Sequence, residues 1–186
     1  MDTKRATTIS KFLSLVLRHD PAAAGVSLDA GGWVDVDALL VGAAKAGTPF
    51  TREELEAVVA ASDKQRFSVS DDGQRIRANQ GHSVAVDLGL LPRTPPAVLY
   101  HGTVERFREA IKREGLRPMQ RQHVHLSADP ETASAVGQRR GKPLILTIDA
   151  AALHAAGHTF YLSANGVWLT DAVPPGYFSD INDEQI

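Results

Sequence analysis

The apolar residues near the start of the chain recur with the spacing of an α-helix. A helix with one buried face shows apolar residues at positions i, i+3, i+4, i+7 and i+8. The residues that fit this spacing are Ile9, Phe12, Leu13, Val16 and Leu17. We predict a second helix over residues 36–46. Thr51 and Glu54 form a capping box, which predicts the start of a third helix that runs through Ala60.

The pattern changes to strand-like alternation after the third helix. Residues 66–70 and 75–77 alternate polar and apolar side chains around the turn sequence Asp71-Asp72-Gly73, which predicts a β-hairpin. Three helices followed by a hairpin resemble a winged helix. Three prolines then fall within residues 92–96, where they exclude a helix and favour an extended connection. We therefore predict two lobes, residues 1–91 and residues 97–186, joined by a linker at 92–96.

The second predicted lobe is richer in strands. Pro130 stands at the tolerated first position of a helix, and Gly115 is placed to end one. Asn165-Gly166 is a strong signal for a tight hairpin turn. The predicted strands are 98–103, 123–127, 143–149, 160–163 and 167–170, and the predicted helices are 104–114 and the segment that begins at Pro130. The whole pattern predicts an α+β protein.

The amino-acid composition excludes several classes of function. The chain has 186 residues, of which 43% are hydrophobic, so it is long enough for one domain or two small lobes. It has no cysteine, which excludes disulfides, thiol catalysis and cysteine-ligated metals. The first residues resemble neither a signal peptide nor a membrane span, so we expect a soluble, cytoplasmic monomer with no membrane partner. The formal charge of −2 gives no overall attraction to nucleic acid, so a polyanion requires a local cluster of cations.

The first helix ends on an unusual group of residues. In the sequence FLSLVLRHDP, residues 12–21, the apolar stripe gives way to Arg18 and His19 before Pro21 stops the helix. At about 100° per residue, Arg18 lies opposite Ile9 and points away from the core. The simplest explanation is that cations complement the negative end of the helix dipole.

Other cations and imidazoles also fall at the ends of predicted elements. They are Arg66, Arg77, His82, His101, Arg121, His123, His125, Arg139, Arg140 and Lys142. Each has an ordinary structural explanation, because exposed strand positions and helix ends favour long charged side chains and a histidine is often a hydrogen-bonded core residue. As a set, they point to phosphate, since the planar guanidinium group donates to phosphate bidentately and stays protonated.

Several common active sites are excluded by their missing motifs. His123 and His125 share one face of a strand, yet no third metal ligand accompanies them at a recognisable spacing, so we expect no metal. The chain has no Gly-x-Ser-x-Gly elbow and no Walker A or Gly-x-Gly-x-x-Gly loop. The remaining possibility is a reaction whose substrates carry phosphates and supply their own nucleophile. Gly102 would then let a dinucleotide approach the backbone closely, with a hydroxyl offered by Thr103.

Seven motifs in order closely resemble those of the RNA 2′-phosphotransferase family, which includes the tRNA-splicing 2′-phosphotransferase. They are LVLRHDP (15–21), KQRF (64–67), RANQGHS (77–83), LYHGT (99–103), RQHVHLS (121–127), RGKP (140–143) and NGVWLT (165–170). The resemblance runs from about Ser10 to Tyr177. It implies an N-terminal winged-helix RNA-binding lobe and a C-terminal ADP-ribosyltransferase-like lobe that binds NAD, with the active site in the cleft between them.

The resemblance also implies a two-step reaction that consumes NAD as a co-substrate. The internal 2′-phosphate of an RNA attacks the ribose carbon that bears nicotinamide, and an RNA-2′-phospho-ADP-ribose intermediate forms. The neighbouring ribose hydroxyl then attacks phosphorus, which yields RNA with a 2′-hydroxyl and ADP-ribose 1″,2″-cyclic phosphate. Both nucleophiles belong to substrates. The expected biological settings are tRNA splicing or RNA repair, and the partners are NAD and RNA that carries a 2′-phosphate.

The family motifs carry roles onto matching residues of this sequence. The implied catalytic residues are Arg18, His19, Arg66 and Arg121. The implied NAD-binding residues are His101, Gly102, Thr103, Ser127 and Arg140. The implied RNA-binding residues are Arg77, Gln80 and His82. The resemblance leaves open whether His19 binds the transferring phosphate or moves a proton.

Two other functions remain open from the sequence. An ADP-ribosyltransferase that caps terminal phosphates of RNA or DNA would share the fold and the NAD site, and its stable ADP-ribosylated product would distinguish it. A winged-helix regulator without enzymatic activity would use only the first lobe. Residues 52–56, Arg-Glu-Glu-Leu-Glu, disfavour the regulator, because a helix that reads a DNA groove should be basic.

Overall fold

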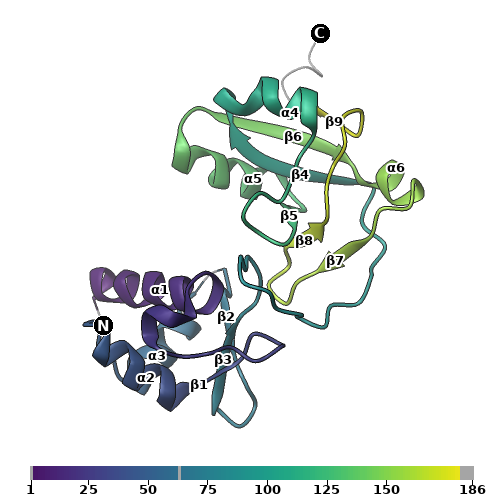
Figure 1. The fold of residues 1–186 in the computed structure, drawn as a ribbon. Helices are drawn as coiled ribbons and strands as arrows, with labels where there is room; N and C mark the ends of the chain where they lie inside the picture. Colours follow the sequence, from purple (N-terminus) through teal and green to yellow (C-terminus); the bar gives the residue numbers. More distant parts are fainter. Residues whose placement is uncertain (1, 63, 181–186) are drawn as a thin grey trace. The chain divides into compact units, whose positions relative to one another are not determined.

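The chain folds into two compact units, residues 1–89 and residues 90–186. The structure is a computed structural model that describes residues 2–62 and 64–180 (Figure 1). Each unit has its own hydrophobic core, and each combines helices with small antiparallel sheets. The predicted α+β class is therefore confirmed.

Three helices form most of the first unit. They are α1 (Thr3–Arg18), α2 (Val36–Lys45) and α3 (Arg52–Ala60). The apolar stripe predicted for α1 is buried at four positions, Ile9, Leu13, Val16 and Leu17. The capping box predicted at the start of α3 is also confirmed. Helical periodicity and end signals were thus sufficient to place these helices.

The sheet of the first unit contains β1 (Val34–Asp35), β2 (Phe67–Val69) and β3 (Arg75–Ala78) in the order β1-β3-β2. The predicted hairpin is confirmed, because β2 pairs with β3 antiparallel. Strand β1 was not predicted, since two residues are too few to show a period. Figure 1 shows the three helices packed beside this sheet, and their shared core includes residues from both.

Aspartate side chains cap the N-termini of several helices. The carboxylates that accept a hydrogen bond from the first turn of a helix are those of Asp2, Asp20, Asp35, Asp129 and Asp149. The carboxylate of Glu54 makes two kinds of contact. It completes the capping box of α3, and it accepts two hydrogen bonds from the guanidinium group of Arg5, at 2.9 and 2.8 Å. The hydrogen bonds from Arg5 lower the pKa of Glu54 to about 2. Much of the negative charge of the first unit is therefore engaged in local structure.

A short 3₁₀ helix, η1 (Pro21–Ala24), follows α1 and packs against α2. The contact is so close that a Cβ atom placed on Gly42 would lie 2.0 Å from the carbonyl oxygen of Ala24. Only glycine therefore fits at this point of α2. The contact fixes the path of the chain directly after α1, where Arg18 and His19 lie.

The second unit contains two three-stranded sheets. One has the order β4-β6-β9, with β4 (Val98–Val104), β6 (Pro143–Asp149) and β9 (Phe178–Asp180). The other has the order β5-β8-β7, with β5 (Val124–Leu126), β7 (Phe160–Leu162) and β8 (Trp168–Thr170). A bridge between Tyr100 and Ser127 joins β4 to the segment after β5. The predicted hairpin around Asn165-Gly166 is confirmed by the pairing of β7 with β8.

The helices of the second unit are η2 (Glu105–Phe107), α4 (Arg108–Glu114), α5 (Pro130–Gly137), η3 (Gln138–Arg140) and α6 (Ala150–Ala155). The prediction of one helix over 104–114 was wrong at its start, because Val104 is the last residue of β4 and a 3₁₀ turn follows it. Helix α6 and strand β9 were not predicted. Helix α6 has fewer than two turns, and β9 pairs with β6, which is not its neighbour in the sequence, so no local pattern marks either element.

The two faces of the β4-β6-β9 sheet are packed differently. Leu144, Leu146 and Ile148 of β6 point into the hydrophobic core, which Ile111 of α4 also contacts. On the opposite face, α5 packs so closely on β4 that a Cβ atom on Gly102 would lie 1.7 Å from the carbonyl oxygen of Ala133. Figure 1 shows α4 and α5 on opposite sides of these strands. Close helix packing is therefore the structural reason for glycine at position 102.

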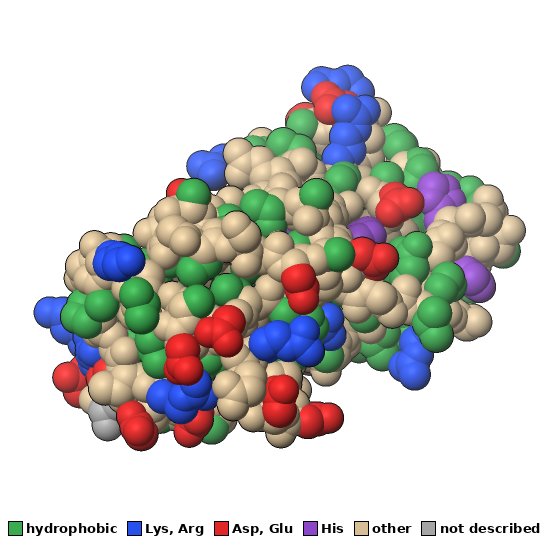
Figure 2. All heavy atoms as spheres, turned by 60° about the horizontal axis from the view of Figure 1, so that its bottom comes forward, with side chains coloured by type: hydrophobic (Ala, Val, Ile, Leu, Met, Phe, Trp, Pro, Cys, Tyr) green, Lys and Arg blue, Asp and Glu red, His purple; other side chains and the backbone are tan. Residues whose placement is uncertain are grey.

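Charges of both signs occur together on the face drawn in Figure 2. Lysine and arginine side chains lie among aspartates and glutamates there, without forming one continuous basic area within the described part of the chain. Two ion pairs of the first unit illustrate this mixing, Arg5 with Glu54 and Arg52 with Asp37. Among residues 2–62 and 64–180, no helix is both long and apolar enough to span a bilayer.

The Gly42 contact gives a test of the fold. A glycine-to-alanine change inside a helix normally stabilises it by about 1 kcal/mol. Here we expect Gly42→Ala to lower the free energy of unfolding by about 1–3 kcal/mol, because the new methyl group collides with the Ala24 carbonyl. Urea unfolding followed by circular dichroism measures the change. Val41→Ala, at an exposed position of the same helix, is the control and should change stability little. A Gly42→Ala protein as stable as the wild type would contradict this account of the contact.

Candidate functional site

The end of α1 is held to residues 82–84 by hydrogen bonds. The carbonyl oxygen of Arg18 accepts hydrogen bonds from the backbone N–H groups of Ser83, at 2.8 Å, and Val84, at 3.3 Å. The hydroxyl of Ser83 lies 2.9 Å from Nδ1 of His19. The carbonyl groups at the end of a helix lack partners within the helix, and here residues 83 and 84 supply them. Two of the sequence motifs are thereby joined within the first unit.

Arg18 is oriented by an aromatic ring. Its guanidinium carbon lies 5.7 Å from the centroid of the Phe67 ring, a distance typical of a cation–π contact. Arg66 directly precedes Phe67, and its backbone carbonyl accepts a hydrogen bond from the N–H of Asn79 at 3.0 Å. Arg18 therefore contacts the first residue of β2, and Arg66 directly precedes that residue. Both arginines are partly buried.

Arg77 is held by Trp33, which the sequence analysis did not identify. The guanidinium carbon of Arg77 lies 4.6 Å from the centroid of the indole ring, and Nη1 donates to the carbonyl oxygen of Gly31 at 3.4 Å. Arg75 lies over the same ring at 5.5 Å and pairs with Asp29 at 3.6 Å. Alternate residues of β3 thus place two arginines against one tryptophan.

His82 is a buried imidazole beside these cations. Only 2% of its surface is exposed, and its Nε2 atom has no hydrogen-bond partner within residues 2–62 and 64–180. Burial lowers the pKa of His82 to about 4, and the positive charges of Arg18, His19 and Arg77 contribute to the same shift. The ring is therefore neutral at pH 7. Gln80, in the same connection after β3, is partly buried.

The second unit contains a separate chain of polar contacts. Nδ1 of His101 lies 2.9 Å from the backbone carbonyl oxygen of His125. Because a carbonyl only accepts, this Nδ1 carries the hydrogen. Nη1 of Arg121 lies 2.9 Å from Nδ1 of His125, which must accept from the guanidinium group. Burial lowers the pKa of His101, and the charge of Arg121 adds to the effect. His101 is therefore a neutral ring whose Nε2 atom is available as an acceptor.

The other predicted NAD-binding residues lie around β4. Alternation places Thr103 on the same face of the strand as His101. Ser127 pairs with Tyr100 through two backbone hydrogen bonds of 2.9 and 2.7 Å, which places it beside the start of β4. For Gly102, our expectation that its missing side chain admits a dinucleotide was wrong, because Ala133 of α5 fills that space. The side chain of Arg140 lies outside the described residues.

His123 and His125 have different partners, and only His125 belongs to β5, because the predicted strand 123–127 was too long at both ends. Nε2 of His123 lies 3.7 Å from the carboxylate of Asp171, and its ring lies 5.6 Å from that of Tyr161. His125 instead accepts from Arg121. Within the described part of the chain, no three histidine or acidic side chains lie close enough together to hold a metal ion.

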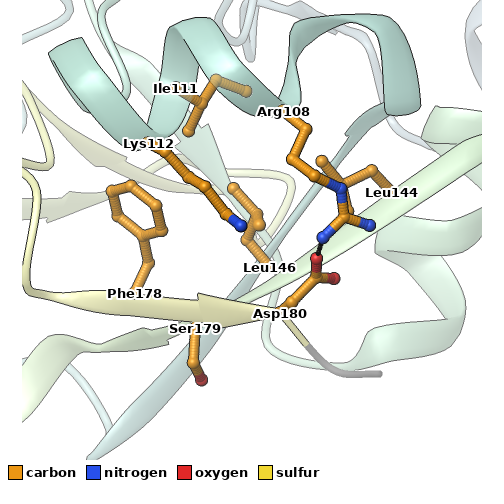
Figure 3. A pocket seen from close by; sticks show the side chains of 8 residues that line it. All are labelled: Arg108, Ile111, Lys112, Leu144, Leu146, Phe178, Ser179 and Asp180. Carbon is orange, nitrogen blue, oxygen red and sulfur yellow. Dashed lines mark ion pairs between the residues drawn. The ribbon is translucent and has the colours of Figure 1, made fainter. Parts of the chain in front are cut away.

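A cavity of about 270 Å³ in the second unit contains none of the residues predicted to be functional. Figure 3 shows it between α4 and strands β6 and β9, with the ammonium group of Lys112 pointing into it and Arg108 paired with Asp180 at one side. Its other lining residues are largely apolar. Two of these lining residues, Leu146 and Leu144, pair across the sheet with His101 and Thr103.

The site residues identified from sequence fall into two groups, one in each unit. In the first unit, direct contacts and electrostatic effects connect Arg18, His19, Arg77 and His82, with Arg66 beside them. In the second unit, contacts and electrostatic effects connect Arg121 with His101. Sequence reasoning missed Trp33 and Ser83. The alternation of Arg75 and Arg77 indicated a shared face, but nothing in the sequence showed that Trp33 would cover it.

The sequence comparisons agree with one another. The chain matches the model of the family described as "RNA 2'-phosphotransferase, Tpt1 / KptA family" over residues 4–172. It is 59% identical over 184 residues to the "Probable RNA 2'-phosphotransferase" of Streptomyces griseus, covering 95% of this chain and 97% of that protein. Proteins of the same name from Agrobacterium fabrum, 60% identical over 94% of both chains, and Nostoc punctiforme, 55% identical over 97% of this chain and 100% of that protein, are similar.

The buried imidazole of His82 makes the free energy of unfolding depend on pH. His82 has a pKa of about 4 in the folded protein and an ordinary pKa of 6.5 when unfolded. Between these values the unfolded chain binds more protons, so stability is lost as the pH falls through this window. We expect the free energy of unfolding of the first unit to fall by up to about 3 kcal/mol between pH 7 and pH 4 because of this group.

Urea unfolding at a series of pH values measures this effect. The first unit is followed through the fluorescence of Trp33 in a protein that carries Trp168→Phe. His82→Asn should flatten the pH dependence, whereas His154→Asn, at an exposed position of α6, should leave it unchanged. Equal slopes for the wild type and His82→Asn would show that His82 is not held neutral by the fold.

Proposed function

The chain belongs to the RNA 2′-phosphotransferase family of the Tpt1/KptA type, and we propose that it removes an internal 2′-monophosphate from RNA in a reaction that consumes NAD. The observation that carries the proposal is the cation group at the end of α1. Arg18 and Arg77 are each held against an aromatic ring, and His19 is tied to Ser83. Fixed guanidinium groups bind phosphate without losing much side-chain entropy.

The proposed chemistry has two steps, and both nucleophiles come from the substrates. An oxygen of the RNA 2′-phosphate attacks C1″ of the NAD ribose, and the breaking C–N bond leaves its electron pair on nicotinamide. The product of this step is RNA-2′-phospho-ADP-ribose. The 2″-hydroxyl then attacks phosphorus, and the bond from phosphorus to the RNA 2′-oxygen breaks. The hydroxyl proton ends on that 2′-oxygen, so the products are 2′-hydroxyl RNA and ADP-ribose 1″,2″-cyclic phosphate.

The protein contributes positive charge and orientation. We assign Arg18, Arg66 and Arg121 to the phosphate, where they orient it for the first attack and neutralise charge on phosphorus in the second. We assign His19 to the same phosphate, with its Nδ1 atom held 2.9 Å from the hydroxyl of Ser83. Arg77, Gln80 and His82 bind the RNA next to it.

The residues around β4 have the donors and acceptors that a dinucleotide requires. Nε2 of His101 is an acceptor, since Nδ1 is engaged by His125, and it can bind a ribose hydroxyl. We assign Thr103 and Ser127 to the same ligand, together with Arg140. Gly102 supports this site indirectly, because its close contact with α5 keeps β4 in place. In this proposal, the first unit is the winged-helix RNA-binding lobe and the second is the ADP-ribosyltransferase-like lobe.

A direct assay tests the proposal. The protein is incubated with NAD and an oligoribonucleotide that carries one internal 2′-phosphate, and both loss of that phosphate and release of nicotinamide are measured. We expect one nicotinamide for each phosphate removed, with cyclic phosphate on the ADP-ribose product. The same RNA with only a terminal phosphate is the comparison. A stable ADP-ribosylated terminus without removal of internal 2′-phosphate would refute the proposed reaction.

Substitution of Arg121 tests its assignment to the phosphate. We expect Arg121→Ala to lower kcat by at least about 100-fold, the usual cost of removing one donor from a developing oxyanion. Because Arg121 is exposed, the fold should be retained, as judged by circular dichroism. Arg117→Ala is the matched control, since this nearby arginine has 64% of its side chain exposed and pairs loosely with Glu114 at 4.0 Å. If Arg121→Ala kept the wild-type rate, Arg121 would have no catalytic role.

A further inference from the structure

Two positions in the described ranges, 2–62 and 64–180, have a left-handed backbone without being glycine. They are Gln65, with a φ of 39°, and Met119, with a φ of 57°. A residue with a Cβ atom rarely adopts this region, and the strain persists only where the surrounding structure imposes it. Gln65 directly precedes Arg66, and Met119 lies two positions before Arg121. Each strained position therefore comes just before an arginine that we assign to the phosphate.

A buried amide side chain holds the backbone at Gln65. Asn79 directly follows β3 and is 4% exposed. Its Nδ2 atom donates to the carbonyl oxygen of Gln65 at 2.5 Å, and its Oδ1 atom accepts from the hydroxyl of Ser68 at 2.6 Å. Its backbone N–H donates to the carbonyl oxygen of Arg66 at 3.0 Å. Asn79 thus bonds to both peptide groups that flank Arg66.

The segment that follows α3 holds the other side of this turn. The N–H of Gln65 donates to the carbonyl oxygen of Ser62 at 2.8 Å, and the N–H of Arg66 lies 3.4 Å from the hydroxyl of the same serine. Gln65 itself is exposed, and these contacts are made by its backbone. A change of Gln65 to an ordinary φ would break hydrogen bonds of the buried Asn79 amide, which is costly.

We propose that Asn79 is a positioning residue for Arg66. By holding Gln65 in the left-handed conformation, it sets the direction in which the side chain of Arg66 leaves the backbone. The amide acts through Arg66 and not on a substrate. The inference deepens the proposed function and rests on it, because it takes from there the assignment of Arg66 to the 2′-phosphate. It adds a residue to which the family motifs gave no role, although that residue lies within RANQGHS.

The physical reason lies in the length of an arginine side chain. A rotation about the backbone bonds of Gln65 changes the direction of the Cα–Cβ bond of Arg66, and the long side chain amplifies this change at the guanidinium group. A misplacement of about 1 Å can lower the rate of a reaction about 100-fold. A turn built around a strained residue needs an added constraint, and the amide of Asn79 supplies it.

Two substitutions of Gln65 test the backbone conformation. Both remove the same exposed side chain, and circular dichroism checks that both variants fold. Glycine adopts a positive φ readily, whereas valine, which is β-branched, strongly disfavours it. For RNA with one internal 2′-phosphate, we expect the kcat of Gln65→Val to be at least about tenfold lower than that of Gln65→Gly. Equal kcat values for the two variants would overturn the inference.

Asn79→Ala tests whether Asn79 acts through Arg66. We expect it to lower kcat at least about tenfold in the wild-type protein and to cause no further loss in a protein that carries Arg66→Ala, because the group that it positions is then absent. Equal losses in both backgrounds would overturn the inference. Ser70→Ala, which removes a hydroxyl bonded to Asp72 after β2, is the control and should keep the wild-type kcat. If Asn79→Ala does not fold, the two Gln65 variants decide.

Amide hydrogen exchange separates this inference from the proposed function, because it requires no substrate. The N–H of Asn79 donates to the carbonyl oxygen of Arg66, so its exchange rate reports how firmly the two residues are joined. In the full-length protein we expect this N–H to exchange at least about tenfold faster in Gln65→Val than in Gln65→Gly. Equal exchange rates would overturn the inference, whatever the activity.

The remaining outcomes distinguish the two conclusions. If exchange differs as expected but the wild-type protein does not remove 2′-phosphate, the hold of Asn79 on Arg66 stands and the proposed function is wrong. If the protein removes 2′-phosphate and the two Gln65 variants do so at equal rates, the reaction stands and the positioning role of Asn79 is wrong.

Discussion

The carbonyl oxygen of Arg18 is the acceptor on which the first unit's functional arrangement depends. It receives the N–H groups of Ser83 and Val84, so the end of α1 and the segment after β3 form one structure. The side chains of Arg18, His19 and His82 are brought together because their backbones are joined there. Burial of the opposite face of α1 then fixes the direction in which these groups point.

The helices of the first unit could be predicted from the sequence because each has a local signal. The apolar spacing of α1 and the reciprocal hydrogen bonds of the capping box at α3 involve residues within a few positions of one another. Strand β1 has only two residues, and β1 and β9 pair with β3 and β6, which are not their neighbours in the sequence, so no local hairpin signal marks them. Element type was therefore predictable where the cause was local.

The same distinction applies to the candidate site. Arg18, His19 and Arg77 could be singled out as cations at element ends, and the family resemblance supplied roles for them. Their mutual support could not be predicted, because the bond between Ser83 and Arg18 uses backbone atoms that every residue possesses. Trp33 was missed for a related reason, since its partner arginines lie more than forty positions away in β3. For Gly102, the sequence did not show that the space beside it is filled by Ala133 of α5, a residue thirty-one positions away in the chain.

The aspartates at the helix starts bear on how proteins of this kind are recognised from their sequences. Five of them accept hydrogen bonds from the first turns of helices, so their negative charge serves the backbone. The overall charge of −2 consequently says little about the surroundings of His82, where the neighbouring charges are positive. An isoelectric point averages these two populations of charge. A search for RNA-processing enzymes that filtered candidates by basicity would discard such a chain, although several of its positive charges gather near His82.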